Sequence, residues 1–271
     1  MVLRAYFDAS RRQSGISCVA GVAYGIDRGK KAQREWRSIF GVKGCHMTDL
    51  HARRGPFSGI SDAEAGRLCR AAVRVINQYA SFIAVVSCDE DEVQRLAPSE
   101  TLPHSEPLLD SARSAYNCGL HWAMMAMGLL AGKGQRIDYW FERGDEFQGA
   151  ARRFLSVLND PKIEALRQSY CYGSDSFASK ADENLFDTAD LVAWEWGKHV
   201  DRLREGKRTR PSLEALMNGP CVLAGQPYRH SETRYANHYT GAPLENYFDK
   251  MRRIMTAATH DEVDAVIRSS V

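Results

Sequence analysis

Four acidic side chains stand where the chain could bring them together. Asp8 lies in or just after a short apolar segment, and Glu142 closes the segment DYWFE. Asp187 and Asp190 lie in the first turns of ENLFDTADLVAWEW, which reads as an apolar helix. Residues three apart in a helix share a face, so Asp187 and Asp190 can point the same way. Because burying an unpaired charge is costly, these acids should face a partner.

A cation is the partner that such a cluster would need. Carboxylates that converge at one edge of a sheet repel one another unless positive charge lies between them. Oxygen-only ligand sets with several carboxylates favour Mg²⁺ or Mn²⁺ over zinc. Two such ions can activate a water and stabilise the leaving oxygen in phosphodiester cleavage. The placement therefore predicts a metal site at Asp8, Glu142 and Asp190, with Asp187 as a further candidate ligand.

Each acid taken alone has a simpler explanation. Asp8 could be a turn residue, and Glu142 could pair with Arg143 or another surface base. Asp187 could be an N-terminal helix residue favoured by the helix dipole. Asp190 is harder to explain in this way, because ADLVAW is apolar on both sides of it. The hypothesis of a metal site therefore depends on the combined placement.

Two basic residues could assist such chemistry. His46 could transfer protons, since histidine titrates near neutrality, although a lone histidine in a loop is more often structural. Lys180 precedes the acidic helix and could offer a point charge to a phosphate, whereas a lone exposed lysine would have no such role. A Ser or Cys nucleophile has weaker support, because the sequence has no G-x-S-x-G motif. It also lacks a P-loop and a dinucleotide-binding glycine motif.

The elements that must position these residues follow from the hydrophobic pattern. Strands are expected at 2–8 and 16–24, in SFIAVVSC and in RIDYWFE, with one more short strand in SYCYGSDSFASK. Helices are expected in KKAQREWRSIFG, at 61–80 with Ser61 as the N-cap, at 105–131, at 145–170 with a break near Pro161, and in the acidic segment. A hairpin followed by alternating helices and strands predicts a mixed α/β sheet with helices packed on it. Beyond about residue 205 the chain is expected to form short helices and a loop around GQPYRHSETRY.

Composition restricts the class of protein. The 271 residues are 44% hydrophobic and 26% charged, as in globular proteins. No apolar run reaches membrane-spanning length and no signal peptide is recognisable, so a soluble cytoplasmic protein is expected. Seven scattered cysteines without a CxxC pair indicate free thiols in a reducing compartment. A net charge of +2 argues neither for nor against nucleic acid, although RLREGKRTR at 202–210 is a local basic patch or simply solvated surface.

Four segments of the sequence resemble the bacterial domain of unknown function 3800 family. They are YFDAS, CHMTDLHARRGPFSG, DYWFERGDE and SFASKADENLFDTADLVAW. The resemblance implies a ribonuclease-H-like fold and core acids at Asp8, Glu142 and Asp190. It also points to Ser10 and His46, and to the Ser-Lys pair that ends in Lys180. Genes of this kind often belong to mobile elements or defence systems, which nothing in the sequence shows directly.

The sequence departs from the family pattern at three positions. Ala9 stands where members often have Glu, Glu142 where Asp is frequent, and Asp187 where Gln is usual. The first departure removes one potential ligand, whereas the other two keep carboxylates at the site. Asp187 is therefore either an extra ligand or a residue that supports the ligands.

These observations predict an α/β, ribonuclease-H-like domain over 1–205, with an insertion around 41–60, and a helical C-terminal extension over 206–271 packed on it. The expected function is hydrolysis of nucleic-acid phosphodiester bonds, DNA or RNA, with Mg²⁺ or Mn²⁺ as cofactor. His46 would help proton transfer, and Lys180 and Ser10 would contact substrate. A homo-oligomer is compatible with the sequence, and no membrane partner is expected. The alternative is a non-catalytic interaction module that keeps the fold.

Overall fold

The computed structural model describes residues 2–41, 44–97, 114–132, 134–144, 147–158, 164–218, 228–231 and 233–256. The first two strands form the expected hairpin. β1 (Val2–Arg11) pairs antiparallel with β2 (Ile16–Gly25), and Gly15 in the turn has a φ of 76°, which glycine adopts without a steric cost. Nine of the ten residues of β2 are buried, which places this strand inside the sheet rather than at its edge.

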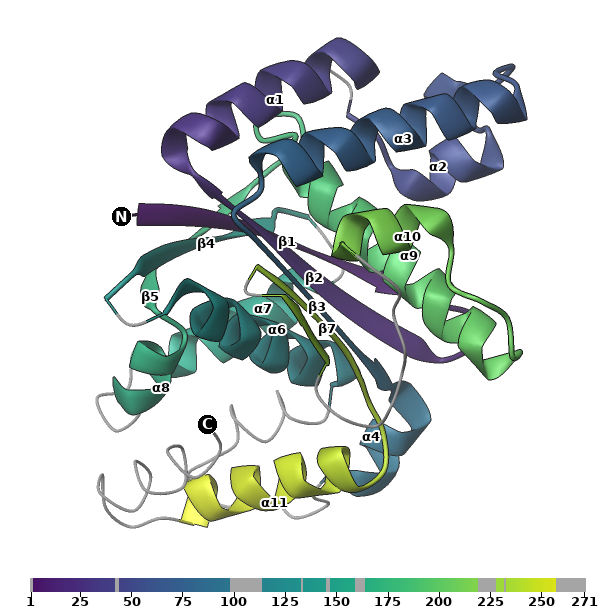
Figure 1. The fold of residues 1–271 in the computed structure, drawn as a ribbon. Helices are drawn as coiled ribbons and strands as arrows, with labels where there is room; N and C mark the ends of the chain where they lie inside the picture. Colours follow the sequence, from purple (N-terminus) through teal and green to yellow (C-terminus); the bar gives the residue numbers. More distant parts are fainter. Residues whose placement is uncertain are drawn as a thin grey trace.

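A seven-stranded mixed sheet is built around this hairpin (Figure 1). β3 (Phe82–Asp89) continues it antiparallel to β2, while β4 (Arg136–Glu142) lies parallel to β1 on the other side. β5 (Tyr172–Ala178) is parallel to β4, β7 (Arg234–Tyr239) is parallel to β3, and β6 (Tyr228–Ser231) is antiparallel to β7. The strand order is β5-β4-β1-β2-β3-β7-β6. Because β1, β4 and β5 are parallel neighbours, their carboxyl ends meet at one edge.

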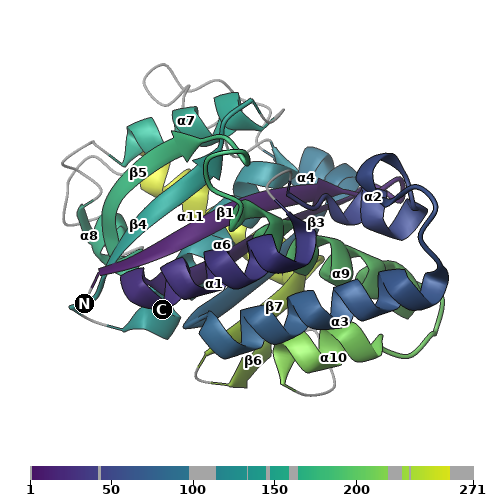
Figure 2. The ribbon, with the colours of Figure 1, turned by 90° about the horizontal axis from the view of Figure 1, so that it is seen from above.

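Helices cover both faces of the sheet, and each face has its own hydrophobic core (Figures 1 and 2). One face carries α1 (Ile26–Phe40), α2 (Met47–Ala52), the 3₁₀ turn Gly55–Phe57, α3 (Asp62–Tyr79), α9 (Phe186–Arg204) and α10 (Pro211–Met217). The other carries α6 (Ala115–Ala131), α7 (Gln148–Val157), α8 (Glu164–Ser169) and α11 (Ala242–Thr256), with α4 (Glu90–Leu96) following β3. Buried Trp36 and Trp196 belong to the core of the first face. None of the helices described here is both long and apolar enough to cross a membrane.

The α/β architecture expected from the sequence, a mixed sheet with flanking helices, is confirmed. Ser61 caps α3 as expected, accepting a hydrogen bond from the backbone N–H of Glu64. The expected helix over 105–131 is seen from Ala115 onwards, and the break expected near Pro161 lies outside the described residues, between α7 and α8.

The C-terminal segment differs from the expectation in one respect. It contains the helices α10 and α11, but it also supplies β6 and β7, where a loop was expected. β7 forms because its backbone pairs with β3, from Ile83 with Arg234 to Cys88 with Tyr239. This pairing joins distant parts of the chain, and the local pattern of RYANHY gives little sign of it.

Candidate active site

Strand pairing brings Asp8 and Glu142 to the same edge of the sheet. Phe7 of β1 is paired with Phe141 of β4, so the next residue on each strand is an acid. Glu142 is in turn paired with Ala178, the last residue of β5. The chain that leaves β5 therefore passes directly over the two carboxylates, and Lys180 is in this segment.

The Lys180 side chain lies between the two acids. Its Nζ is 2.9 Å from Asp8 Oδ2 and 3.1 Å from Glu142 Oε2. Asp8 is buried, and its other carboxyl oxygen accepts a hydrogen bond from the backbone N–H of Ala9 at 2.7 Å. Lys180 was expected to contact a phosphate; in this structure its ammonium is the cation of the carboxylate cluster.

Helix α9 and the segment before α2 complete the cluster. Asp190 Oδ2 accepts a hydrogen bond from the backbone N–H of Met47 at 3.0 Å and lies 3.8 Å from His46 Nδ1. The same His46 nitrogen is 3.4 Å from Lys180 Nζ. Asp8, Glu142, Asp190, His46 and Lys180 thus meet at one place, although they come from five separate segments of the chain.

Asp187 has a second set of partners. Its Oδ2 accepts hydrogen bonds from the backbone N–H of Cys45 at 2.7 Å and from the indole N–H of Trp36 at 3.2 Å. It thereby fixes the segment that carries His46. Its Oδ1 is buried, and none of the residues that the structure describes forms a hydrogen bond with it. Metal ligation by Asp187 stays a prediction, and it would involve this second oxygen.

Gly44 shows how closely that segment approaches α9. A Cβ added at Gly44 would lie 2.9 Å from Asp187 Oδ2, and its φ is 74°, in the left-handed region. Both facts favour glycine at this position. The sequence did not reveal the roles of Gly44 and Trp36, because their contacts with Asp187 span more than a hundred residues of chain. Ser10 lies two residues beyond Asp8 in β1, so the two side chains share a face of the sheet.

Burial and neighbouring charges set the protonation of the cluster. Burial raises the pKa of Asp8, with Asp190 and Glu142 adding to the effect, while Lys180 lowers it. Burial alone would lower the pKa of Lys180, but Asp8, Asp190 and Glu142 raise it above its usual value. We infer that Lys180 stays protonated, because attraction to the three nearby carboxylates outweighs the effect of burial on its ammonium.

The pKa values of His46 and Asp187 are also shifted. Interaction with the Asp190 carboxylate is the main cause that raises the pKa of His46, against the opposing effects of burial and Lys180. Burial raises the pKa of Asp187 to about 6, although the N–H groups of Cys45 and Trp36 lower it in part. Perturbed groups gathered in one place are typical of functional sites, although structural ion pairs perturb pKa values too.

The chemistry of the donor set fits a hard divalent cation. Carboxylate oxygens of Asp8 and Glu142 converge on one positive centre, with Asp190 beside it, and such oxygens are the ligands that Mg²⁺ and Mn²⁺ prefer. Lys180 Nζ takes the place of that cation. Within the described ranges, no three His, Cys, Asp or Glu side chains are already close enough together to hold a metal ion. A metal would therefore bind here only when the ammonium moves out from between the acids.

Comparisons with known proteins give a distant likeness of fold. No family model matches the chain, and no curated protein matches it. Among solved structures, it is similar to ribonuclease H2 from Pyrococcus horikoshii OT3, with 11% identity, a TM-score of 0.41, and coverage of 98% of this chain and 99% of the other. It is also similar to ribonuclease HII in a PCNA complex from Archaeoglobus fulgidus, with 17% identity, a TM-score of 0.36, and coverage of 80% and 87%. Similarities this distant do not transfer an activity or a substrate.

Proposed function

We propose that this protein is a metal-dependent nuclease that hydrolyses phosphodiester bonds of nucleic acid. The observation that carries the proposal is the convergence of Asp8, Glu142 and Asp190 at the sheet edge, around a site occupied by the Lys180 ammonium. Bringing three acids from β1, β4 and α9 together costs folding free energy, and perturbed groups gathered in this way are typical of functional sites. Membership of the domain of unknown function 3800 family is part of this proposal and depends on the four segments quoted above.

Each residue of the site would have a separate task. Asp8, Glu142 and Asp190 would hold Mg²⁺ or Mn²⁺, which would supply positive charge to a phosphate and make a water more acidic. Lys180, displaced from between the acids, would carry its charge to a non-bridging phosphate oxygen. His46 is exposed and its Nδ1 lies 3.8 Å from Asp190 Oδ2, so it can exchange a proton with substrate or solvent. Ser10 would contact substrate from the same face of β1.

One observation favours the alternative, a non-catalytic interaction module. Lys180 already compensates Asp8 and Glu142, so the buried Asp8 and the half-buried Glu142 need no metal to balance their charge. In that case the cluster would be a structural ion-pair network that fixes the ends of β1, β4 and β5. The two functions differ in whether a divalent cation enters the cluster.

A nuclease assay decides between them. Single- and double-stranded DNA and RNA would be incubated with the protein in Mg²⁺, in Mn²⁺ and in EDTA. The nuclease proposal expects cleavage that requires the metal and that is lost in the Asp8→Asn, Asp190→Asn double variant. Asp27→Asn is the matched control, because it removes an exposed carboxylate of α1 and should leave cleavage unchanged. Equal cleavage by the double variant and the wild type would assign the activity to a contaminant and refute the proposal.

A further inference from the structure

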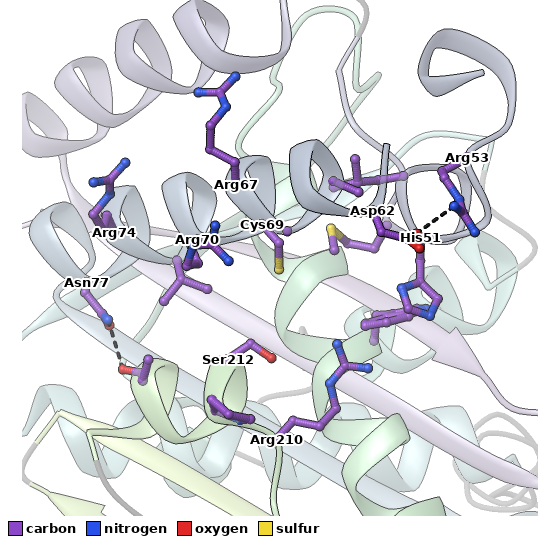
Figure 3. Close-up of a pocket in the computed structure, with 18 residues that line it drawn as sticks. His51, Arg53, Asp62, Arg67, Cys69, Arg70, Arg74, Asn77, Arg210 and Ser212 are labelled. Atoms are coloured by element: carbon purple, nitrogen blue, oxygen red, sulfur yellow. Dashed lines mark hydrogen bonds and ion pairs between the residues drawn. The ribbon is translucent and has the colours of Figure 1, made fainter. Parts of the chain in front are cut away.

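A concave site lies beside the acid cluster. It is a pocket of about 890 Å³ between α3 and the segment that leads into α10, closed at one end by α2 (Figure 3). Leu50, Val73 and Trp194 contribute apolar surface to it. The volume is within the range of roughly 300–1,000 Å³ found for small-molecule sites. The nuclease site described above does not use this pocket.

Positive charge surrounds the pocket. Its lining includes five arginines, Arg53, Arg67, Arg70, Arg74 and Arg210, but only one acid, Asp62. The arginines of α3 lie on one side and Arg210 on the other (Figure 3).

Three of these arginines already have carboxylate partners. Arg53 pairs with Asp62 at 2.6 Å, Arg67 with Glu64 at 2.6 Å, and Arg210 with the buried Glu195 at 3.1 Å. Arg70 and Arg74 are exposed, and neither forms an ion pair with a carboxylate of the described residues. These two side chains are therefore available to bind an anion.

The surroundings of His51 show the same excess of positive charge in the pocket. It lies in the pocket lining, with its ring 4.7 Å from the ring of Trp194. Burial lowers the pKa of His51, and Arg210, Lys198 and Arg53 lower it further, while Asp62 acts in the opposite direction. The charges that face this ring are thus predominantly positive.

Two helices connect the pocket with the acid cluster. Asp190 and Trp194 are four residues apart in α9, so they share a face, separated by about one helical turn, or roughly 6 Å of rise. Met47 and His51 are related in the same way in α2. The backbone of Met47 binds Asp190, while its side chain lines the pocket. The two sites are therefore about one turn of helix apart.

We propose that this pocket holds an unpaired nucleotide of a single-stranded nucleic acid, next to the phosphodiester that lies at the acid cluster. The base would contact Leu50, Val73 and Trp194, and the flanking phosphates would lie against Arg70 and Arg74. The inference rests on the proposed function, because it assigns the strand type of the substrate of that site and the place of one of its nucleotides.

The shape and the positive charge of the pocket both favour a nucleotide of a single strand. A duplex keeps its bases stacked and paired, so it presents no base to a concave site, whereas a single strand can place a base in it. Arginine binds phosphate oxygens in a bidentate manner, and base contacts with apolar or aromatic side chains tolerate any sequence. A free mononucleotide would fill the pocket but would lack the phosphates that reach both arginines, so a strand should bind more tightly.

Binding measurements in EDTA test the pocket independently of cleavage. The probes are a labelled oligothymidylate, a labelled oligouridylate, a labelled DNA duplex and AMP, and the readout is fluorescence anisotropy, with AMP as a competitor. The Arg70→Glu, Arg74→Glu double variant should weaken single-strand binding by about tenfold or more, since two phosphate contacts are lost. Its dependence on salt should also fall, by about 0.7 in log–log slope for each lost contact.

Two further variants separate the pocket from surface charge in general. Lys30→Glu, Arg34→Glu makes the same change in charge at exposed positions of α1 outside the pocket and should alter binding by less than about twofold. Ala215→Trp, on the exposed side of α10, fills the pocket without changing charge and should weaken single-strand binding but not duplex binding. Thermal unfolding of each variant shows that the fold is kept.

The outcomes distinguish this proposal from the proposed function. Wild-type single-strand binding by the arginine variant, an equal loss in the α1 control, no effect of Ala215→Trp, or tighter binding of the duplex or AMP would each overturn the pocket proposal. A different result would separate the two proposals. If single-strand binding depends on the pocket but no substrate is cleaved, the nuclease function is refuted and the proposal of nucleotide binding in the pocket is retained.

Discussion

The ammonium of Lys180 lies 2.9 Å from Asp8 Oδ2 and 3.1 Å from Glu142 Oε2, so one cation of the chain compensates two acids on neighbouring strands. The arrangement has two consequences. The acids can be buried without metal, and any metal that binds must displace the lysine. Lys180 and any divalent cation that binds here would therefore compete for the same carboxylate oxygens.

Replacing Lys180 should make the stability of the protein depend on metal. In Lys180→Met, the carboxylates of Asp8 and Glu142 lose their cation, and removal of one partner of a buried ion pair costs about 3 kcal/mol or more. Added Mn²⁺ should recover much of this loss, because it can take the vacated position. Thermal unfolding with and without Mn²⁺ measures both effects.

Lys180→Arg is the matched control for this experiment. It keeps a positive charge beside the acids, so it should lose less stability than Lys180→Met and gain less from Mn²⁺. If Mn²⁺ raises the melting temperature of the two variants equally, the lysine and the metal do not share a site.

The wild type should itself be stabilised by metal. A ligand that binds only the folded state raises its stability by mass action, about 2.7 kcal/mol at a hundred times the dissociation constant. Millimolar Mn²⁺ should therefore raise the melting temperature. Asp190→Asn should reduce that rise, since Asn can keep the hydrogen bond from the Met47 N–H but loses the charge. An identical response in the wild type and in an Asp8→Asn, Asp190→Asn variant would contradict metal binding at this cluster.

The local pattern of the sequence was enough for much of the fold. Short apolar segments predicted the hairpin and β4, and apolar spacings of three and four residues predicted α3. Asp8 and Glu142 stand at the ends of two expected strands, and this placement predicted that they meet. Lys180 could not be placed between them, because its position depends on how the chain turns after β5. The pairing of β7 with β3 was likewise missed, since this contact is made with a distant segment and RYANHY has little apolar alternation.

Asp187 should matter for the fold of the segment that carries His46. Asp187→Ala would leave two buried donors unpaired, the Cys45 N–H and the Trp36 indole N–H, at a cost of about 1–3 kcal/mol each. Asp187→Asn keeps an acceptor and should cost less. Gly44→Ala should be destabilising as well, because its Cβ would lie 2.9 Å from Asp187 Oδ2 at a φ of 74°. Denaturant unfolding ranks the three variants, and a stable Asp187→Ala protein would contradict this role.

His46 should affect turnover rather than folding. Its side chain is 59% exposed, so His46→Ala should change the free energy of unfolding little. If it transfers a proton, the rate of cleavage should fall by roughly 10²–10⁴-fold. The nearby Asp190 carboxylate raises its pKa, so the protonated form persists to higher pH than in a free histidine.

Turnover and thermal unfolding measured on one preparation separate the two effects. His46→Gln keeps a polar group without a titrating proton and is the conservative control. A folded His46→Ala protein with wild-type turnover from pH 6 to pH 8 would remove His46 from the mechanism.

A buried histidine in the second half of α9 should make stability depend on acid pH. His199 is fully buried, and neither ring nitrogen has a hydrogen-bond partner among the residues described. Burial, with a contribution from Arg202, lowers its pKa from 6.5 to about 4. Between these values the unfolded chain binds a proton that the folded chain does not, so stability is present above pH 6.5 and is lost as the pH falls towards 4.

The variant His199→Phe should remove this dependence while keeping an aromatic ring in the core. The free energy of unfolding of the wild type, relative to the variant, should decline from neutral pH to pH 4 by on the order of 2–3 kcal/mol, at about 1.4 kcal/mol for each pKa unit. Denaturant titrations of both proteins across this range measure the difference. His51→Phe, which removes an exposed histidine of α2, should change the pH dependence much less. Parallel curves for the wild type and His199→Phe would show that His199 binds its proton equally in the folded and unfolded chains.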